Sequence, residues 1–167
     1  MAIPSSPMKT PDQLTEAFRA RGLKVTPQRQ AIFSALVGNT AHPTAESVYA
    51  AVSVHLPTIS LRTVYQTLND LAEMGELNHV HLGTGSSRYD PNLAPHHHLV
   101  CTECGEVTDV HAHFDHLGLD PTEAAGYALG STEIVFRGVC PACQRTDSET
   151  SPSPTQPSSG EGGPPRH

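Results

Sequence analysis

Four cysteines, arranged as two CxxC pairs, are the residues of this sequence whose chemistry is easiest to assign. Cys101 and Cys104 form the first pair, Cys140 and Cys143 form the second, and the chain has no other cysteine. Two such turns can direct four thiolates at one tetrahedral zinc ion and so tie two distant segments together. In a reducing compartment paired cysteines are more often metal ligands than disulfides. We therefore expect a closed structural zinc site, with redox pairs and disulfides as the alternatives.

Nitrogen and oxygen ligands gather next to the first cysteine pair. His96 and His98 are two positions apart on an expected strand, so their side chains point to the same face and that of His97 to the other. Asp109 can approach them if the next strand pairs with the first across the 102–105 turn. These three side chains are candidate ligands of a second metal ion.

Two further candidates lie outside this pair of strands. His42 stands in a loop of the N-terminal half, and Asp90 stands at the junction between the halves. A set of imidazoles and carboxylates without sulfur favours Fe(II) or Mn(II) over zinc. Spacing alone leaves other readings open, because Asp90 can cap a turn and a triple histidine can belong to a solvated loop.

The elements that must position these residues begin with four short helices. Capping residues, prolines and glycines predict helices at about 11–21, from 27 to Gly38, from Thr44 to a point before Pro57, and from Ser60 to near Gly75. Two strands at 77–82 and 87–90 then flank a Gly-Thr-Gly turn. This order predicts a winged helix, with a small helical domain as the alternative.

The fourth helix has a polar face that suits DNA. Arginine and glutamine can each form two hydrogen bonds to a base edge, and tyrosine can contact phosphate. The candidate DNA contacts are Arg62, Thr63, Tyr65 and Gln66. Charge agrees with this assignment, because residues 1–80 carry six basic and six acidic side chains whereas residues 81–167 carry four and eleven. The first half can approach a phosphate backbone, and the second suits cations.

The second half is rich in β-forming residues. Strands are expected at 97–101, 106–110 and 132–139, with a short helix near 114–118, which makes a small α+β domain in need of a zinc cross-link. Residues 146–167 are dominated by Ser, Pro, Gly and Thr, and they predict a disordered tail. The expected boundaries are 1–90, 91–145 and 146–167. No signal peptide or membrane span is apparent, so a soluble cytoplasmic protein is expected.

An enzyme is the alternative from another class, either a zinc-dependent hydrolase or a thiol oxidoreductase. A catalytic zinc needs an open coordination position, which four cysteines leave closed. A thioredoxin-like pair would begin a helix after a strand in a βαβ unit, and neither CxxC has that context. We therefore expect a protein that is not an enzyme.

Six ordered motifs between about residues 10 and 145 resemble the ferric uptake regulator (Fur) superfamily of bacterial metal-dependent repressors. They are TPQRQAIF (26–33), AHPTAESVY (41–49), ISLRTVYQTLNDLAEMGEL (59–77), SSRYD (86–90), HHHLVCTECGEVTDV (96–110) and GVCPAC (138–143). The resemblance implies a homodimer that binds palindromic double-stranded operator DNA. It also implies an α+β fold, with an N-terminal winged-helix DNA-binding domain and a small C-terminal α/β dimerisation domain that carries the zinc.

Within the superfamily the chain resembles the peroxide-sensing repressors of the PerR type. Their regulatory site consists of three histidines and two aspartates, and the matching positions are His42, Asp90, His96, His98 and Asp109. The resemblance implies Fe(II) or Mn(II) as corepressor, and oxidation of His42 or His96 by peroxide in the iron form. A manganese- or iron-uptake regulator of the same fold, without peroxide sensing, is the alternative.

Overall fold

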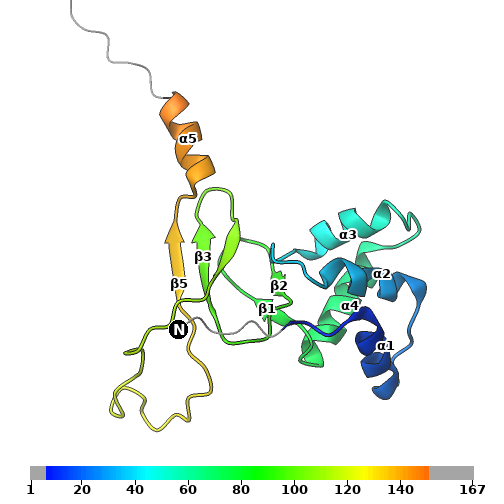
Figure 1. Ribbon diagram of the computed structural model, residues 1–167, viewed down its shortest axis with the longest axis horizontal. Helices are drawn as coiled ribbons and strands as arrows, with labels where there is room; N and C mark the ends of the chain where they lie inside the picture. Colours follow the sequence, from blue (N-terminus) through cyan, green and yellow to red (C-terminus); the bar gives the residue numbers. More distant parts are fainter. Residues whose placement is uncertain (1–6, 151–167) are drawn as a thin grey trace, which may run out of the picture.

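A computed structural model gives the fold and describes residues 7–150 of the 167-residue chain. Four helices pack together in the N-terminal half (Figure 1): α1 (Pro11–Ala20), α2 (Pro27–Leu36), α3 (Ala45–Ser53) and α4 (Leu61–Glu73). Within the described part of the chain, none of the helices has the length and apolar character needed to span a membrane.

Each of the four helices begins at a capping residue. The hydroxyls of Thr10, Thr26, Thr44 and Ser60 accept a hydrogen bond from the backbone N–H three residues later, and Thr10 forms a full capping box with Gln13. These bonds satisfy amides that have no partner inside the helix. The helix starts predicted from the capping residues are confirmed.

The helices share one hydrophobic core. Phe18 and Phe33 meet edge to face with their ring centroids 4.9 Å apart. Val64, Leu68 and Leu71 bring one face of α4 into the same core, and all five side chains are fully buried. Burying such a side chain stabilises the fold by about 1.5–3 kcal/mol. The core thus fixes α4 with its opposite face towards solvent.

A two-stranded hairpin follows the helices. Strand β1 (Asn78–Val80) pairs antiparallel with β2 (Arg88–Asp90), and the hairpin lies between the helices and the second sheet (Figure 1). Gly83 and Gly85 adopt positive φ angles in the connecting turn, a conformation that suits glycine. Four helices followed by a hairpin are the predicted winged-helix order.

The C-terminal half is a three-stranded sheet in the order β4-β3-β5. Strand β3 (His97–Cys101) pairs antiparallel with β4 (Val107–Val110) and parallel with β5 (Val135–Gly138). Helix α5 (Pro141–Thr150) then points away from the sheet (Figure 1). The predicted class, a helical half followed by a small mixed half, is confirmed.

Two predictions about this half differ from the structure. Residues 114–118 form no helix, because a short helix is stable only when it packs an apolar face. Phe114 lies beside the rings of His97 and Phe136, but Leu117 and Leu119 are about half exposed. Helix α5 continues to Thr150, so residues 146–150 belong to a helix and not to the predicted tail. A helix can extend this far because no proline follows Pro141 until Pro152. The rest of the predicted tail, 151–167, lies outside the described residues.

Candidate metal centres

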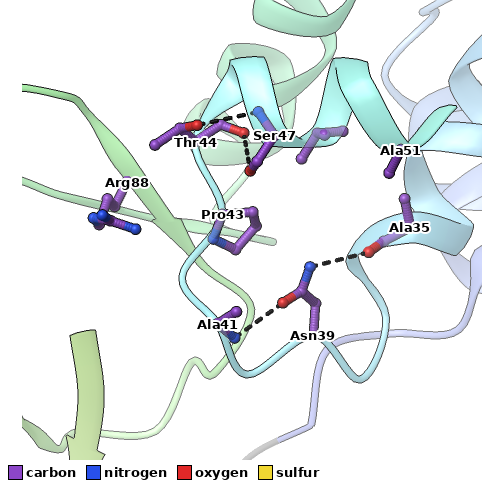
Figure 2. A pocket seen from close by; sticks show the side chains of 9 residues that line it. Ala35, Asn39, Ala41, Pro43, Thr44, Ser47, Ala51 and Arg88 are labelled. Atoms are coloured by element: carbon purple, nitrogen blue, oxygen red, sulfur yellow. Dashed lines mark hydrogen bonds between the residues drawn. The ribbon is translucent and has the colours of Figure 1, made fainter. Parts of the chain in front are cut away.

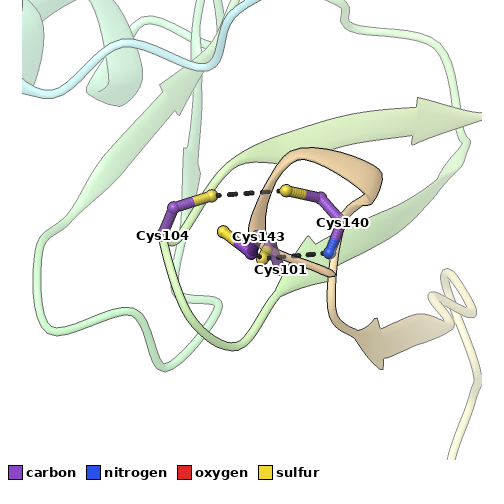
Figure 3. Close-up of side chains that lie close together, drawn as sticks. All are labelled: Cys101, Cys104, Cys140 and Cys143. Carbon is purple, nitrogen blue, oxygen red and sulfur yellow. Dashed lines mark hydrogen bonds between the residues drawn. The ribbon is translucent and has the colours of Figure 1, made fainter. Parts of the chain in front are cut away.

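The four cysteines meet beyond the C-terminal ends of β3 and β5 (Figure 3). The sulfurs of Cys101 and Cys143 are 3.9 Å apart and those of Cys104 and Cys140 are 3.8 Å apart. A tetrahedral zinc ion with bonds of about 2.3 Å separates its sulfurs by about 3.8 Å, whereas bonded sulfurs lie about 2.05 Å apart. The spacing fits a zinc ion and excludes disulfides in this arrangement.

Two turns bring these sulfurs together. Cys101 ends β3, and the N–H of Gly105 donates to its carbonyl to close the first CxxC turn. Cys140 directly precedes α5, and its N–H donates to the sulfur of Cys101 over 3.3 Å. The amides of Cys104 and Cys140 lower the pKa of the Cys101 thiol to about 6. These amides therefore favour the thiolate of Cys101, the form that binds metal.

The second cluster draws its members from both halves of the chain. His42 comes from the loop between α2 and α3, Asp90 ends β2, and the rest come from the sheet half. His98 pairs directly with Asp109 in the β3–β4 register, as expected for strands joined by the 102–105 turn. One potential ligand atom from each residue lies within 4.8 Å of all the others, in the set His42, Asp90, His96, His98 and Asp109.

Most of this cluster is withdrawn from solvent. The side chains of His42 and His96 are 1% and 3% exposed, and that of Asp109 is 16% exposed. His42 Nε2 lies 2.7 Å from Asp109 Oδ1, and His96 Nε2 lies 2.8 Å from Asp90 Oδ2. The Nε2 atoms of His96 and His98 are 3.1 Å apart.

These close contacts leave polar atoms unsatisfied. His42 Nε2, Asp90 Oδ2 and Asp109 Oδ1 are buried, and their contacts lack the alignment of a hydrogen bond within the described residues. A buried polar atom without a partner costs about 1–3 kcal/mol. A cation at the point where the five groups converge would satisfy all three atoms, and the donor set of imidazoles and carboxylates suits Fe(II) or Mn(II). The residues present therefore fit such an ion.

Hydrogen bonds orient two of the imidazoles. His96 Nδ1 is 2.7 Å from the carbonyl oxygen of Ala94, and His98 Nδ1 is 2.6 Å from Glu133 Oε1. Both partners are acceptors, so Nδ1 carries the proton in each ring. The Nε2 atoms therefore face the cluster, as required of a metal ligand.

Asp90 and His96 shift each other's pKa. Contact with Asp90 raises the pKa of His96 to about 9, against the effect of burial. Burial disfavours a charge on Asp90, yet the imidazoles of His42, His96 and His98 outweigh it and hold the pKa of this carboxyl below its usual range. A metal ion must therefore displace a proton from His96.

His97 lies outside the cluster, as the alternation along the strand predicts. Its Nδ1 accepts the N–H of Ile134 over 3.1 Å, and its ring centroid lies 5.2 Å from that of Phe114. His97 therefore joins β3 to the chain that enters β5.

Two polar residues that contact the cluster were not predicted from the sequence. The backbone N–H of Asn92 donates to Asp90 Oδ1 over 2.8 Å, and its side-chain Nδ2 donates to Asp109 Oδ2 over 3.3 Å. The Asp-Pro-Asn sequence is a turn signal that could have pointed to this bond. Glu133 stands 35 positions from His98, and no local pattern marks it.

The predicted DNA contacts lie on α4. Arg62, Tyr65 and Gln66 are exposed, whereas Thr63 is partly buried in the first turn, where its N–H donates to the cap Ser60. The Tyr65 hydroxyl donates to Glu46 on α3 over 2.5 Å, which holds the ring at the surface. Their role in binding DNA remains a prediction.

Comparisons with known proteins agree on one family. Residues 20–136 match the sequence profile of the Ferric uptake regulator family. The chain is 34% identical over 137 residues to the "Peroxide operon regulator" of Bacillus subtilis (strain 168), a match that covers 79% of this chain and 92% of that protein. It is 33% identical over 133 residues to the "Peroxide-responsive repressor PerR" of Staphylococcus aureus (strain Mu50), covering 77% and 87%.

Solved structures show the same architecture. The ferric uptake regulator of Vibrio cholerae superposes with a TM-score of 0.58 at 30% identity, covering 76% of this chain and 99% of that one. The Helicobacter pylori regulator superposes with a TM-score of 0.66 at 20% identity, covering 83% and 97%, and it supports the fold alone.

Proposed function

Since the chain belongs to the ferric uptake regulator family, we propose that it is a metal-dependent transcriptional repressor of the peroxide-responsive kind. It binds palindromic operator DNA as a homodimer, with Fe(II) or Mn(II) as corepressor and zinc at the four cysteines. The observation that carries the proposal is the convergence of five ligand atoms from both halves of the chain within 4.8 Å. The matching relatives are named as regulators, and none of those cited is named as an enzyme.

The two halves have separate tasks in this proposal. Residues 1–90 form the DNA-binding domain and residues 91–145 the dimerisation domain, whose partner is a second copy of the chain. A repressor works where the DNA is, so the proposed location is the cytoplasm. Helix α5 runs past the proposed boundary at residue 145.

The residues of the second cluster explain how a metal would control DNA binding. His42 belongs to the helical half, whereas His98 and Asp109 belong to the sheet. These residues would hold a divalent cation, which would supply the positive charge between the two halves; Fe(II) there would in addition be able to reduce peroxide. When the groups are held together, α4 keeps one orientation relative to the sheet. In a dimer, two α4 helices would then match the spacing of palindromic half-sites.

Metal-dependent DNA binding is the first test. An operator is selected from random palindromic DNA with Mn(II)-loaded protein, and its binding is then measured by fluorescence anisotropy with and without Mn(II). We expect strong binding only with Mn(II), and loss of that dependence in His42→Ala. The matched control is His55→Ala, which removes an exposed histidine beyond the end of α3. Binding that ignores Mn(II) would contradict the proposal.

Peroxide sensing needs its own test, because the Vibrio cholerae relative is an iron regulator. Protein loaded with Fe(II) without air is treated with peroxide, and peptides that contain His42 or His96 are analysed by mass spectrometry. We expect one added oxygen atom on either peptide together with loss of operator binding, and no change in the Mn(II)-loaded control. Unmodified peptides and retained binding would indicate a metal-uptake regulator instead.

A further inference from the structure

Arg88 connects the two candidate metal centres. One of its terminal nitrogens donates to the carbonyl of His42 over 3.0 Å, and the other donates to the carbonyl of Gly105 over 2.7 Å. The first carbonyl belongs to a candidate ligand of the second cluster, and the second belongs to the turn that follows the first cysteine pair. We propose that Arg88 is a positioning residue that makes the placement of His42 depend on the folded cysteine turn.

Strand β2 holds the His42 segment at consecutive positions. Arg88 donates to the carbonyl of His42, and the N–H of Tyr89 donates to the carbonyl of Pro43 over 3.0 Å. Asp90, the next residue, is itself a member of the cluster. The strand thereby sets both the backbone of the His42 segment and one of the groups that His42 faces.

The conformation of His42 needs this support. Its φ angle is +49°, in the left-handed region that residues other than glycine adopt less often. Figure 2 shows how the flanks are held: the Asn39 side chain bonds to Ala35 and Ala41, and Thr44 caps α3. Between these flanks, the carbonyls of His42 and Pro43 are bonded from β2. The bond from Arg88 is thus a side-chain contact that holds the backbone of the left-handed residue.

The other end of the bridge rests on the cysteine turn. The N–H of Gly105 donates to the carbonyl of Cys101, and the N–H of Cys101 donates to the carbonyl of Glu106. These bonds fix the direction of the Gly105 carbonyl. An ordered cysteine turn therefore fixes the terminal nitrogen of Arg88 that donates to Gly105. Because the guanidinium is planar, this also fixes the other terminal nitrogen, which donates to the carbonyl of His42. Lysine cannot reproduce this, because its ammonium is a point charge on a flexible stem.

One consequence of the inference, that Mn(II) affinity depends on Arg88, rests on the proposed function. Its structural part, the hold on His42, can be measured without Mn(II). The variants are Arg88→Ala and Arg88→Lys. The matched control is Arg137→Ala, because Arg137 also spans the two halves, with a 2.7 Å bond to the carbonyl of Leu82, yet it contacts neither end of the bridge.

The first measurement is amide hydrogen exchange of the peptide that spans residues 39–45, in zinc-loaded protein without Mn(II). We expect faster exchange in Arg88→Ala than in wild type, an intermediate rate in Arg88→Lys, and a wild-type rate in Arg137→Ala. The second is Mn(II) affinity by titration calorimetry, with an expected loss of about tenfold or more in Arg88→Ala at an unchanged zinc content.

The inference would be overturned if Arg88→Ala showed the wild-type exchange rate at 39–45 and the wild-type Mn(II) affinity. It would also be overturned if Arg88→Ala and Arg137→Ala changed both quantities equally. If Arg88→Ala loses its zinc, Arg88→Lys decides, because faster exchange at 39–45 with zinc retained supports the bridge and a wild-type rate refutes it. If wild type binds no Mn(II), the proposed function fails, while the exchange rates still decide whether Arg88 holds His42.

Discussion

Protein that carries zinc but no regulatory metal should keep a proton on His96 up to about pH 9, and Mn(II) should release that proton. The pKa of His96 is raised from 6.5 to about 9, chiefly by Asp90, whose Oδ2 lies 2.8 Å away. At about 1.4 kcal/mol for each pKa unit, the surroundings of His96 together favour its protonated imidazole by about 3 kcal/mol. The His96 side chain is only 3% exposed, so water screens this interaction little.

The sign of the pH dependence follows from this pair. The pKa of His96 is higher in the folded protein than in the unfolded chain. The Asp90–His96 pair therefore stabilises the protein without regulatory metal fully below pH 6.5, and this stabilisation is lost as the pH rises to about 9. Mn(II) needs the neutral imidazole, so its affinity should increase with pH over the same range, by about tenfold per pH unit for one released proton. Metal binding thus replaces a pH-dependent stabilisation by a metal-dependent one.

Two assays measure this proton. An NMR titration of the zinc-loaded protein follows the His96 ring signal, which is assigned by its absence in His96→Gln. Calorimetry of Mn(II) binding in buffers of different ionisation enthalpy counts the protons released. We expect a midpoint near pH 9 and at least one proton released at neutral pH. A midpoint near 6.5 with no proton released would refute the assignment of the Asp90–His96 pair.

Four further substitutions test other parts of the structure. Glu133→Gln should weaken Mn(II) binding, measured by calorimetry, by up to about tenfold, because it removes the carboxylate that holds the Nδ1 proton of His98. An unchanged affinity would show that the half-exposed Glu133 does not orient the ring. Cys104→Ser should lose zinc and lower the melting temperature in differential scanning fluorimetry, whereas a stable, zinc-free protein would contradict a structural site. Arg62→Ala and Gln66→Ala should each weaken operator binding by about 1–3 kcal/mol in anisotropy with Mn(II) affinity unchanged, and wild-type binding in both would place the DNA contact elsewhere.

Local signals account for what the sequence could predict of the fold. Thr10, Thr26, Thr44 and Ser60 marked helix starts, because a capping hydroxyl acts within its own turn. The expected helix at 114–118 did not form, because a short helix needs a packed apolar face and Leu117 is about half exposed.

The candidate sites were predictable to a similar extent. Spacing in sequence separated His96 and His98 from His97, because side chains alternate along a strand. The partners Glu133 and Arg88 were not predictable, since each acts on groups 17 or more positions away through contacts that only the assembled fold creates.

The most direct test of the second metal centre is anomalous diffraction at the manganese edge, from crystals of the zinc-loaded protein grown with Mn(II). We predict one manganese peak per chain, in contact with His42 and Asp90 as well as with the residues of the sheet half, and zinc alone at the four cysteines. A manganese peak that lies away from His42, or that contacts only the sheet half, would contradict a metal ion that joins the two halves.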